Sequence, residues 1–173
     1  MALVTCNRGH QHFGKYGLAG LLIHRYRDTG EVEMLLGRRV ERANPGLSYD
    51  AIEGAIEEKE IAHDCVRRKA EEEIGIKPGD ILIPTAMWDD DHGNWSHTTI
   101  FATPARGYQM PDFKLNHEIE EVVWLTRREL DNVPLNMGFE LHIRNQLNIL
   151  LPPDIDPVTG NIVRYESVPR ALF

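Results

Sequence analysis

Residues 54–76 read GAIEEKEIAHDCVRRKAEEEIGI, and this stretch decides the fold. Within it, apolar side chains recur every four residues at Ala62, Val66, Ala70 and Ile74. This recurrence predicts an amphipathic helix whose apolar row is buried, because residues four apart lie on one face of a helix. Glycines flank the predicted helix on both sides.

The same helix gathers charged side chains beside its buried row. Arg68, Glu72 and Glu73 fall within one and a half turns, so their side chains share a face. Clustered carboxylates suit hard cations such as Mg²⁺, which take oxygen ligands and bridge to substrate phosphates. The segment before the helix adds Glu60 and the backbone carbonyls of a turn near Gly54. The pattern therefore favours a site for a divalent cation.

The spacing resembles the signature of the Nudix hydrolases, G-x5-E-x7-R-E-U-x-E-E-x-G-U, in which U is aliphatic. The polar and glycine positions that agree are Gly54, Glu60, Arg68, Glu72, Glu73 and Gly75. The resemblance covers about residues 14–150 and implies an α/β protein, an α/β/α sandwich with a mixed sheet. It also implies bound Mg²⁺ or Mn²⁺ and attack of water on a diphosphate linkage in a nucleoside diphosphate derivative. In that mechanism Glu72 and Glu73 are the principal metal ligands, Glu60 assists, and Arg68 orients the carboxylates.

One catalytic position departs from the signature. Lys69 stands where the family has glutamate, and a protonated lysine has no lone pair to offer a metal ion. Its ammonium would also pair with Glu72 or Glu73 and compete with the cation. The turn differs as well, because residues 52–54 read Ile-Glu-Gly where the family commonly has Pro-Gly-Gly. Additional carboxylates in the same loop, at Glu53, Glu57 and Glu58, are candidate substitute ligands.

Three classes of function follow from this departure. The first is a divalent-metal-dependent pyrophosphohydrolase that acts on a small nucleotide derivative. The second is a degenerate Nudix domain that binds a nucleotide as a sensor or regulator without efficient hydrolysis. The third is a protein-interaction module that uses the surface of the sandwich.

Composition indicates one ordinary globular domain. The chain has 173 residues, of which 42% are hydrophobic and 27% charged, and its net charge is −8. No basic block marks a nucleic-acid polymer as partner, and no apolar run is long enough to span a membrane. Two cysteines make no disulfide framework, so we expect a cytoplasmic protein. We expect a Nudix domain over 1–150 and a proline-containing extension over 151–173 that packs on this domain or on a partner subunit, as in a homodimer.

Hydrophobic patterning and turn residues place the remaining elements. Strands are expected at 17–26, 31–40, 81–88, 97–102 and 120–125, with the first two forming a hairpin. Helices are expected at 126–130 and 138–150. A loop that contains Asn44-Pro45-Gly46 separates the hairpin from the box, the name used below for residues 54–76.

Two further groups of residues are candidate accessory sites. Asp90 and Trp95 belong to a polar turn, which is either only a turn or a place where a second metal ion binds and an aromatic ring stacks on the substrate. Glu118 and Glu120 precede or begin a strand, at a place where some Nudix enzymes supply an extra base or metal ligand. The alternative for this pair is a charged strand edge that resists aggregation.

The N-terminal segment carries soft metal ligands. Cys6, His10 and His12 lie within seven residues, and sulfur and imidazole are the ligands that Zn²⁺ prefers. Zinc usually takes four ligands, and no nearby Cys-x-x-Cys completes the set. An ordinary N-terminal loop is the alternative reading.

Overall fold

The computed structural model describes residues 3–41, 46–79 and 81–163, and within them a mixed sheet forms the centre of the molecule. Its seven strands are β3 (Leu18–Tyr26), β4 (Val32–Arg39), β5 (Tyr49–Asp50), β6 (Ile52–Ala55), β7 (Leu82–Asp91), β8 (Ser96–Pro104) and β9 (Ile119–Thr126). Apolar residues fill β3 and β4, which are buried over most of their length, as expected for strands covered on both faces.

The sheet is mixed because β3 has neighbours of both directions. It pairs antiparallel with β4 and β6 and parallel with β8. The predicted β3–β4 hairpin is confirmed, with His24 opposite Met34 and Tyr26 opposite Val32. Since β6 is the start of the box, its pairing with β3 places Gly54 beside Ala19. The box is therefore anchored to the middle of the sheet.

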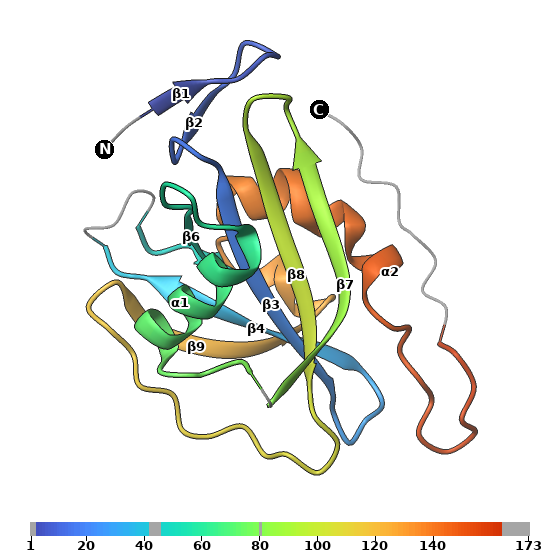
Figure 1. Cartoon of the computed structure of the whole chain (residues 1–173). Helices are drawn as coiled ribbons and strands as arrows, with labels where there is room; N and C mark the ends of the chain where they lie inside the picture. The colour runs from blue at the N-terminus through green and yellow to red at the C-terminus, as the bar shows by residue number, and fades with distance from the viewer. Residues whose placement is uncertain (1–2, 42–45, 80, 164–173) are drawn as a thin grey trace.

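Helices cover the two faces of the sheet (Figure 1). Helix α1 (Ala62–Ile74) lies on one face. The other face is covered by a helical segment made of η2 (Phe139–Ile143), η3 (Arg144–Gln146) and α2 (Leu147–Leu150), preceded by the short η1 (Glu129–Asn132). This arrangement confirms the α/β/α sandwich that the sequence predicted.

Each face has its own apolar core. On the α1 face, Val66, Ala70 and Ile74 pack against the sheet with almost no exposed surface, so the predicted apolar row of the box helix is confirmed. On the opposite face, Phe139 and Ile143 pack in a second cluster of buried residues. The two cores fix the sheet between two layers of helix.

The predicted helix over residues 138–150 exists, but it is not a single α-helix. It begins as a π-helical turn and passes through a 3₁₀ turn before the α-helical end. The buried residues Phe139, Ile143 and Leu147 are four apart. Residues at this spacing lie on one face, and all three pack in the same apolar cluster.

The polar turn predicted at 89–94 is shorter than expected. Strand β7 continues to Asp91 and β8 begins at Ser96, with the carboxylate residues Asp89, Asp90 and Asp91 inside the ladder. Gly93 makes the tight turn possible, because its φ of 88° is readily adopted only by glycine. Likewise, the helix predicted at 126–130 is the 3₁₀ turn η1, shifted by three residues at its start.

A small hairpin at the N-terminus forms a separate sheet. Strands β1 (Leu3–Thr5) and β2 (Gln11–Phe13) pair only with each other among the described residues. The hairpin lies near the β7–β8 turn (Figure 1).

At the other end, the chain after α2 contacts the β3–β4 turn, where the Ile155 N–H donates to the carbonyl of Gly30 over 2.8 Å. Of the predicted extension 151–173, residues 164–173 lie outside the described residues, and its boundary at 150 stays a prediction. No helix in the described ranges combines the length and the apolar character needed to cross a membrane.

Candidate active site

Glycines at both ends of the box set the position of α1. Gly75 ends the helix in the left-handed conformation, with φ of 70°, and its N–H donates to the carbonyl of Ala70. Gly54 lies against the side chain of Lys69. A Cβ atom on residue 54 would lie 2.5 Å from Cε of Lys69. Only glycine therefore lets β6 approach the helix this closely.

Arg68 binds Glu60 with both ends of its guanidinium fork. Its Nε and one terminal nitrogen each donate to a different carboxylate oxygen of Glu60 over 2.8 Å. The same terminal nitrogen donates to the carbonyl of Ala55 over 3.1 Å. The hydrogen bonds from Arg68 lower the pKa of Glu60 to about 2, so this carboxylate is ionised at neutral pH. The pair fixes the loop before α1 to the helix.

Lys69 lies at the centre of three carboxylates. Its Nζ atom is 2.8 Å from Glu73, 3.3 Å from Glu72 and 3.8 Å from Glu118. These four residues are called the box cluster below. Burial alone would lower the pKa of Lys69, but the charges of Glu73, Glu118 and Glu72 outweigh burial and raise it. Lys69 is therefore an ammonium at neutral pH, and the predicted pairing with Glu72 and Glu73 is present.

The box cluster borders a cavity of about 1080 Å³. Of the residues singled out in the sequence, those that line it are His10, His12, Glu53, Gly54, Glu57, Arg68, Lys69, Asp90, Trp95 and Glu118. Glu60, Glu72, Glu73, Gly75 and Glu120 are not lining residues. Glu73 is almost fully buried, whereas Glu120 pairs with Arg38 over 3.4 Å. The structure thus brings Glu118, but not Glu120, to the box.

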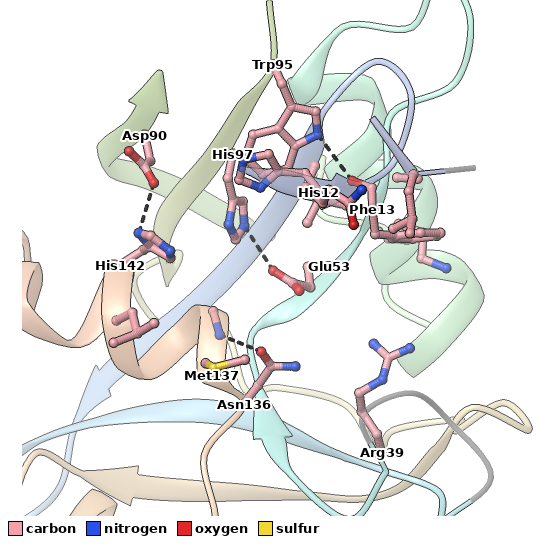
Figure 2. Close-up of a pocket in the computed structure, with 18 of the residues that line it drawn as sticks. His12, Phe13, Arg39, Glu53, Asp90, Trp95, His97, Asn136, Met137 and His142 are labelled. Atoms are coloured by element: carbon pink, nitrogen blue, oxygen red, sulfur yellow. Dashed lines mark hydrogen bonds and ion pairs between the residues drawn. The ribbon is translucent and has the colours of Figure 1, made fainter. Parts of the chain in front are cut away.

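A buried ion pair on the cavity wall joins Glu53, one of the candidate substitute ligands, to His97, which the sequence did not single out. His97 Nε2 of β8 lies 2.9 Å from Glu53 Oε2 of β6, and the two side chains point toward each other in Figure 2. Burial would lower the pKa of His97, but Glu53 raises it. Burial likewise opposes ionisation of Glu53, yet His97 holds its pKa below the usual value. The two residues meet only because β6 and β8 both pair with β3.

Asp50 adds a second buried carboxyl group next to this ion pair. Burial raises the pKa of Asp50 well above its ordinary value, and the charge of Glu53 raises it further. Two adjacent buried carboxylates repel each other, so the site favours the neutral form of Asp50 and the ionised form of Glu53. No local sequence pattern signals this arrangement, because its partners come from separate strands.

The two accessory candidates of the β7–β8 turn lie on another wall of the cavity. The Trp95 ring stacks on His12, with centroids 3.8 Å apart, and its Nε1 donates to the carbonyl of Gly14 over 2.9 Å. Asp90 Oδ2 lies 3.0 Å from His92 and 2.9 Å from His142. Figure 2 shows Asp90 directed toward His142 across the cavity wall. Trp95 is buried, so His12 rather than open space covers one face of its ring.

A family model of the NUDIX domain matches residues 16–143 of the chain. The chain belongs to the Nudix family. The match contains the whole box and the cavity walls from β3 to η2, so the resemblance of residues 54–76 is confirmed.

Relatives and solved structures agree with this assignment. A Mycobacterium tuberculosis protein, provisionally assigned as 8-oxo-dGTP diphosphatase 3, is 26% identical over 79% of this chain and 64% of its own length. A Bifidobacterium longum nucleoside triphosphate pyrophosphatase/Nudix hydrolase fusion protein is 30% identical over 76% of this chain and 27% of its own. This Nudix chain therefore matches less than two thirds of either relative.

Among solved structures, the Nudix hydrolase RenU from M. smegmatis superposes with a TM-score of 0.68 at 24% identity, over 80% of this chain and 88% of that one. This likeness supports the fold.

Proposed function

We propose that the chain hydrolyses a diphosphate linkage in a nucleoside diphosphate derivative with the help of a divalent cation, Mg²⁺ or Mn²⁺. The observation that carries the proposal is the convergence of Glu72, Glu73 and Glu118 on one point beside a cavity. Hydrolysis by relatives of the same family supports the reaction class.

The donor set of the box cluster fits a hard cation. Its three carboxylates surround a single position, and Glu73 Oε2 is buried without a hydrogen-bond partner among the described residues. Glu72 and Glu73 would hold the ion, and Glu118 would replace the carboxylate that Lys69 removes. Lys69 must then leave the position that its ammonium takes. Glu60 is a less available ligand because Arg68 already binds both of its oxygens, so its role in metal binding stays a prediction.

Other residues of the cavity are assigned to substrate binding. A bound divalent cation would polarise the phosphoryl group and lower the pKa of a bound water molecule. Arg39 lines the cavity, and its Nε has no hydrogen-bond partner among the described residues, so it is proposed to bind the diphosphate. Phe13, Met137 and Leu141 are exposed apolar residues of the cavity wall and suit the base or another apolar group.

Proton transfer is assigned to Glu118. Its side chain is 41% exposed and reaches the cavity, so a water molecule can approach it. As the water oxygen bonds to phosphorus, Glu118 accepts a proton, and the bond from phosphorus to the bridging oxygen breaks. The products are a nucleoside monophosphate and the phosphorylated remainder.

One observation favours a second candidate, a Nudix domain that binds a nucleotide without hydrolysing it. The ammonium of Lys69 already pairs with the buried Glu73 and offsets one of the three carboxylate charges of the box cluster. If Lys69 keeps this position when a nucleotide binds, the pocket retains Arg39 and the apolar wall but lacks a cation site. Binding would then persist without turnover, as expected of a sensor or regulator.

The two candidates separate in a hydrolysis assay of the wild-type chain and the Lys69→Glu variant. Suitable probes are an oxidised deoxynucleoside triphosphate, a nucleoside diphosphate sugar and a dinucleoside polyphosphate, each with Mg²⁺ or Mn²⁺. Because the variant restores a carboxylate and removes the competing ammonium, we expect kcat/KM to rise about tenfold, equivalent to about 1.4 kcal/mol of transition-state stabilisation. The matched control is Lys77→Glu, which makes the same charge change at an exposed residue outside the box.

Release of a nucleoside monophosphate by the wild-type chain, dependent on the divalent ion, would support the hydrolase. Saturable nucleotide binding without turnover in either metal would support the second candidate instead. An equal rise in the Lys69→Glu and Lys77→Glu variants would show that bulk charge, and not the box cluster, sets the rate.

A further inference from the structure

The N-terminal hairpin presents three metal-binding side chains on one face. Thr5 is paired with Gln11 in the hairpin, so the next residues, Cys6 and His10, also lie opposite each other. The Cys6 N–H donates to the His10 carbonyl over 2.9 Å. Side chains alternate between the faces of a strand, so Cys6, His10 and His12 point the same way. The turn between them closes with a hydrogen bond from the N–H of Gly9 to the carbonyl of Cys6.

The fourth side chain comes from a distant part of the chain. His92 occupies the β7–β8 turn, and its Nδ1 lies 3.4 Å from the sulfur of Cys6. Two hydrogen bonds dock the hairpin on this turn: the Asn7 N–H donates to the Asn94 side chain over 2.8 Å, and that side chain donates to the Thr5 carbonyl over 3.2 Å. One ligand atom from each of Cys6, His10, His12 and His92 lies within 4.8 Å of the others.

These separations are close to those of a tetrahedral metal site. Zinc bonds of about 2.3 Å to sulfur and about 2.0–2.1 Å to nitrogen place neighbouring ligand atoms roughly 3.3–3.6 Å apart. The contact between Cys6 and His92 already has this length. Separations of up to 4.8 Å need about one ångström of adjustment, and the exposed His10 side chain has room to change rotamer.

The surroundings of the four ligands point to a metal ion independently. His92 Nε2 lies 3.0 Å from Asp90 Oδ2, so the carboxylate holds one ring nitrogen and leaves Nδ1 directed at Cys6. A carboxylate behind a histidine is the usual support of a zinc ligand. His12 Nε2 is buried and has no hydrogen-bond partner among the described residues. A bond to a metal ion would satisfy it.

The hairpin draws little stability from the burial of apolar side chains. Its apolar residues Leu3 and Phe13 are 65% and 40% exposed, so the hairpin has little core of its own. A two-stranded sheet is marginally stable in water. A structural zinc ion contributes folding free energy directly, and a closed set of four sulfur and nitrogen ligands is typical of such sites.

We propose that Cys6, His10, His12 and His92 bind one zinc ion, which fastens the N-terminal hairpin to the β7–β8 turn. Sulfur and imidazole select zinc over the hard cations Mg²⁺ and Mn²⁺. The site is separate from the box cluster and goes beyond the proposed hydrolysis. Since His10, His12 and His92 also line the cavity, the zinc ion fixes the cavity wall opposite the box.

Metal content and cobalt substitution test the proposal without any activity assay. The full chain, purified after expression with added zinc, should carry about one zinc per chain. After removal of zinc, Co²⁺ should produce visible bands of a tetrahedral ion and a thiolate-to-cobalt band. Replacement of the thiolate by Cys6→Ser should remove the thiolate band. The variant His10→Ala alters an exposed ligand, so it keeps the test valid if Cys6→Ser does not fold.

The variants give graded expectations. Cys6→Ser and His10→Ala should each retain at most about a tenth of the zinc after dialysis against a chelator. Asp90→Asn, which only weakens the support of His92, should lower zinc affinity about 10–100-fold. The control His63→Ala changes an exposed histidine of α1 and should keep full zinc content.

A wild-type chain without zinc and without the thiolate-to-cobalt band would overturn the proposal, as would equal zinc loss in His63→Ala and Cys6→Ser. Neither result depends on turnover, so the zinc site and the hydrolase are tested separately.

Discussion

Lys69 gives the carboxylates of the box an internal cation. Its ammonium lies within 4 Å of Glu72, Glu73 and Glu118, and the buried Glu73 would be an uncompensated charge without it. The lysine therefore stabilises the protein at the position where we propose that a divalent ion binds. A divalent ion would have to displace this ammonium. We therefore expect activity to need a higher concentration of divalent ion than in a box with glutamate at position 69.

The Arg68–Glu60 pair makes stability depend on pH in acid. The folded-state pKa of Glu60 is about 2, below its ordinary value of 4.5, so the pair stabilises the fold fully above about pH 5. This contribution falls as pH drops from 4.5 towards 2, because the unfolded chain then binds the proton more readily. Glu60→Gln should lower the free energy of unfolding by about 2 kcal/mol at neutral pH, and the difference from wild type should shrink through that window.

Urea denaturation at several pH values measures this difference. The control Glu71→Gln removes a carboxylate that is 55% exposed and paired only with Lys77 at the surface, so it should change stability by less than about 0.5 kcal/mol. A Glu60→Gln deficit that stays constant down to pH 2 would argue against the Arg68 pair as its source.

At the residue scale, sequence spacing predicted the local contacts and missed the distant ones. The pairing of Lys69 with Glu72 and Glu73 follows from helical spacing alone. By contrast, His97 and Glu53 are 44 positions apart in the sequence, and only the strand order brings them together. The same reason explains why His92 could not be joined to Cys6 from sequence, although Cys6, His10 and His12 were recognised as soft ligands.

At the scale of elements, the glycine after α1 terminates the box helix. Gly75 has φ of 70°, and a Cβ atom there would lie 2.7 Å from the Cβ of Lys114. Gly75→Ala should therefore lower the free energy of unfolding by about 1–3 kcal/mol through backbone strain and displacement of the Lys114 segment. Thermal or urea unfolding measures the loss.

Gly79→Ala is the matched control, because a Cβ atom there meets nothing within 4 Å. If both alanine variants were equally stable, the left-handed end of α1 would not be the structural requirement that its geometry indicates.

Elements with strong periodicity were predicted well, with most strand ends correct to within one or two residues, but the end of β7 was missed by three residues. The β3–β4 hairpin and α1 follow from apolar patterning and turn residues, which act over a few positions. The extra length of β7 comes from pairing with β8, which holds Asp89, Asp90 and Asp91 in the ladder against their low strand propensity. The π-helical start of residues 139–150 depends on the sheet face that it covers, so local sequence carries little sign of it.

At the scale of the whole molecule, the sandwich brings together, around the sheet, the segments that form the cavity walls. The box comes from one side through β6 and α1, the β7–β8 turn lies opposite, and η2 supplies Leu141 and His142. The family resemblance predicted this architecture because the box fixes the fold class. It could not predict the substrate, since the cavity side chains come from segments outside the box.

The buried carboxylate of Asp154 helps to join the chain after α2 to the sandwich. Asp154 Oδ1 accepts a hydrogen bond from the N–H of Val32 over 2.6 Å and lies 3.0 Å from Arg127. Both Asp154 and Val32 are buried, so removal of the carboxylate takes the acceptor from the Val32 N–H and the charged partner from Arg127, which still donates to the carbonyl of Pro152. Asp154→Ala should lower the free energy of unfolding by about 3 kcal/mol, measured by urea denaturation.

The loss in free energy of unfolding caused by Asp154→Ala shows whether residues 151–156 unfold cooperatively with the sandwich. The control Asp28→Ala removes an exposed carboxylate from the nearby β3–β4 turn and should change stability by less than about 0.5 kcal/mol. If Asp154→Ala unfolds in one transition with the full loss, residues 151–156 fold together with the sheet. If its stability equals that of Asp28→Ala, the segment contributes nothing to the sandwich and would be a separate unit, because removal of one partner of a buried charge pair destabilises a cooperative core.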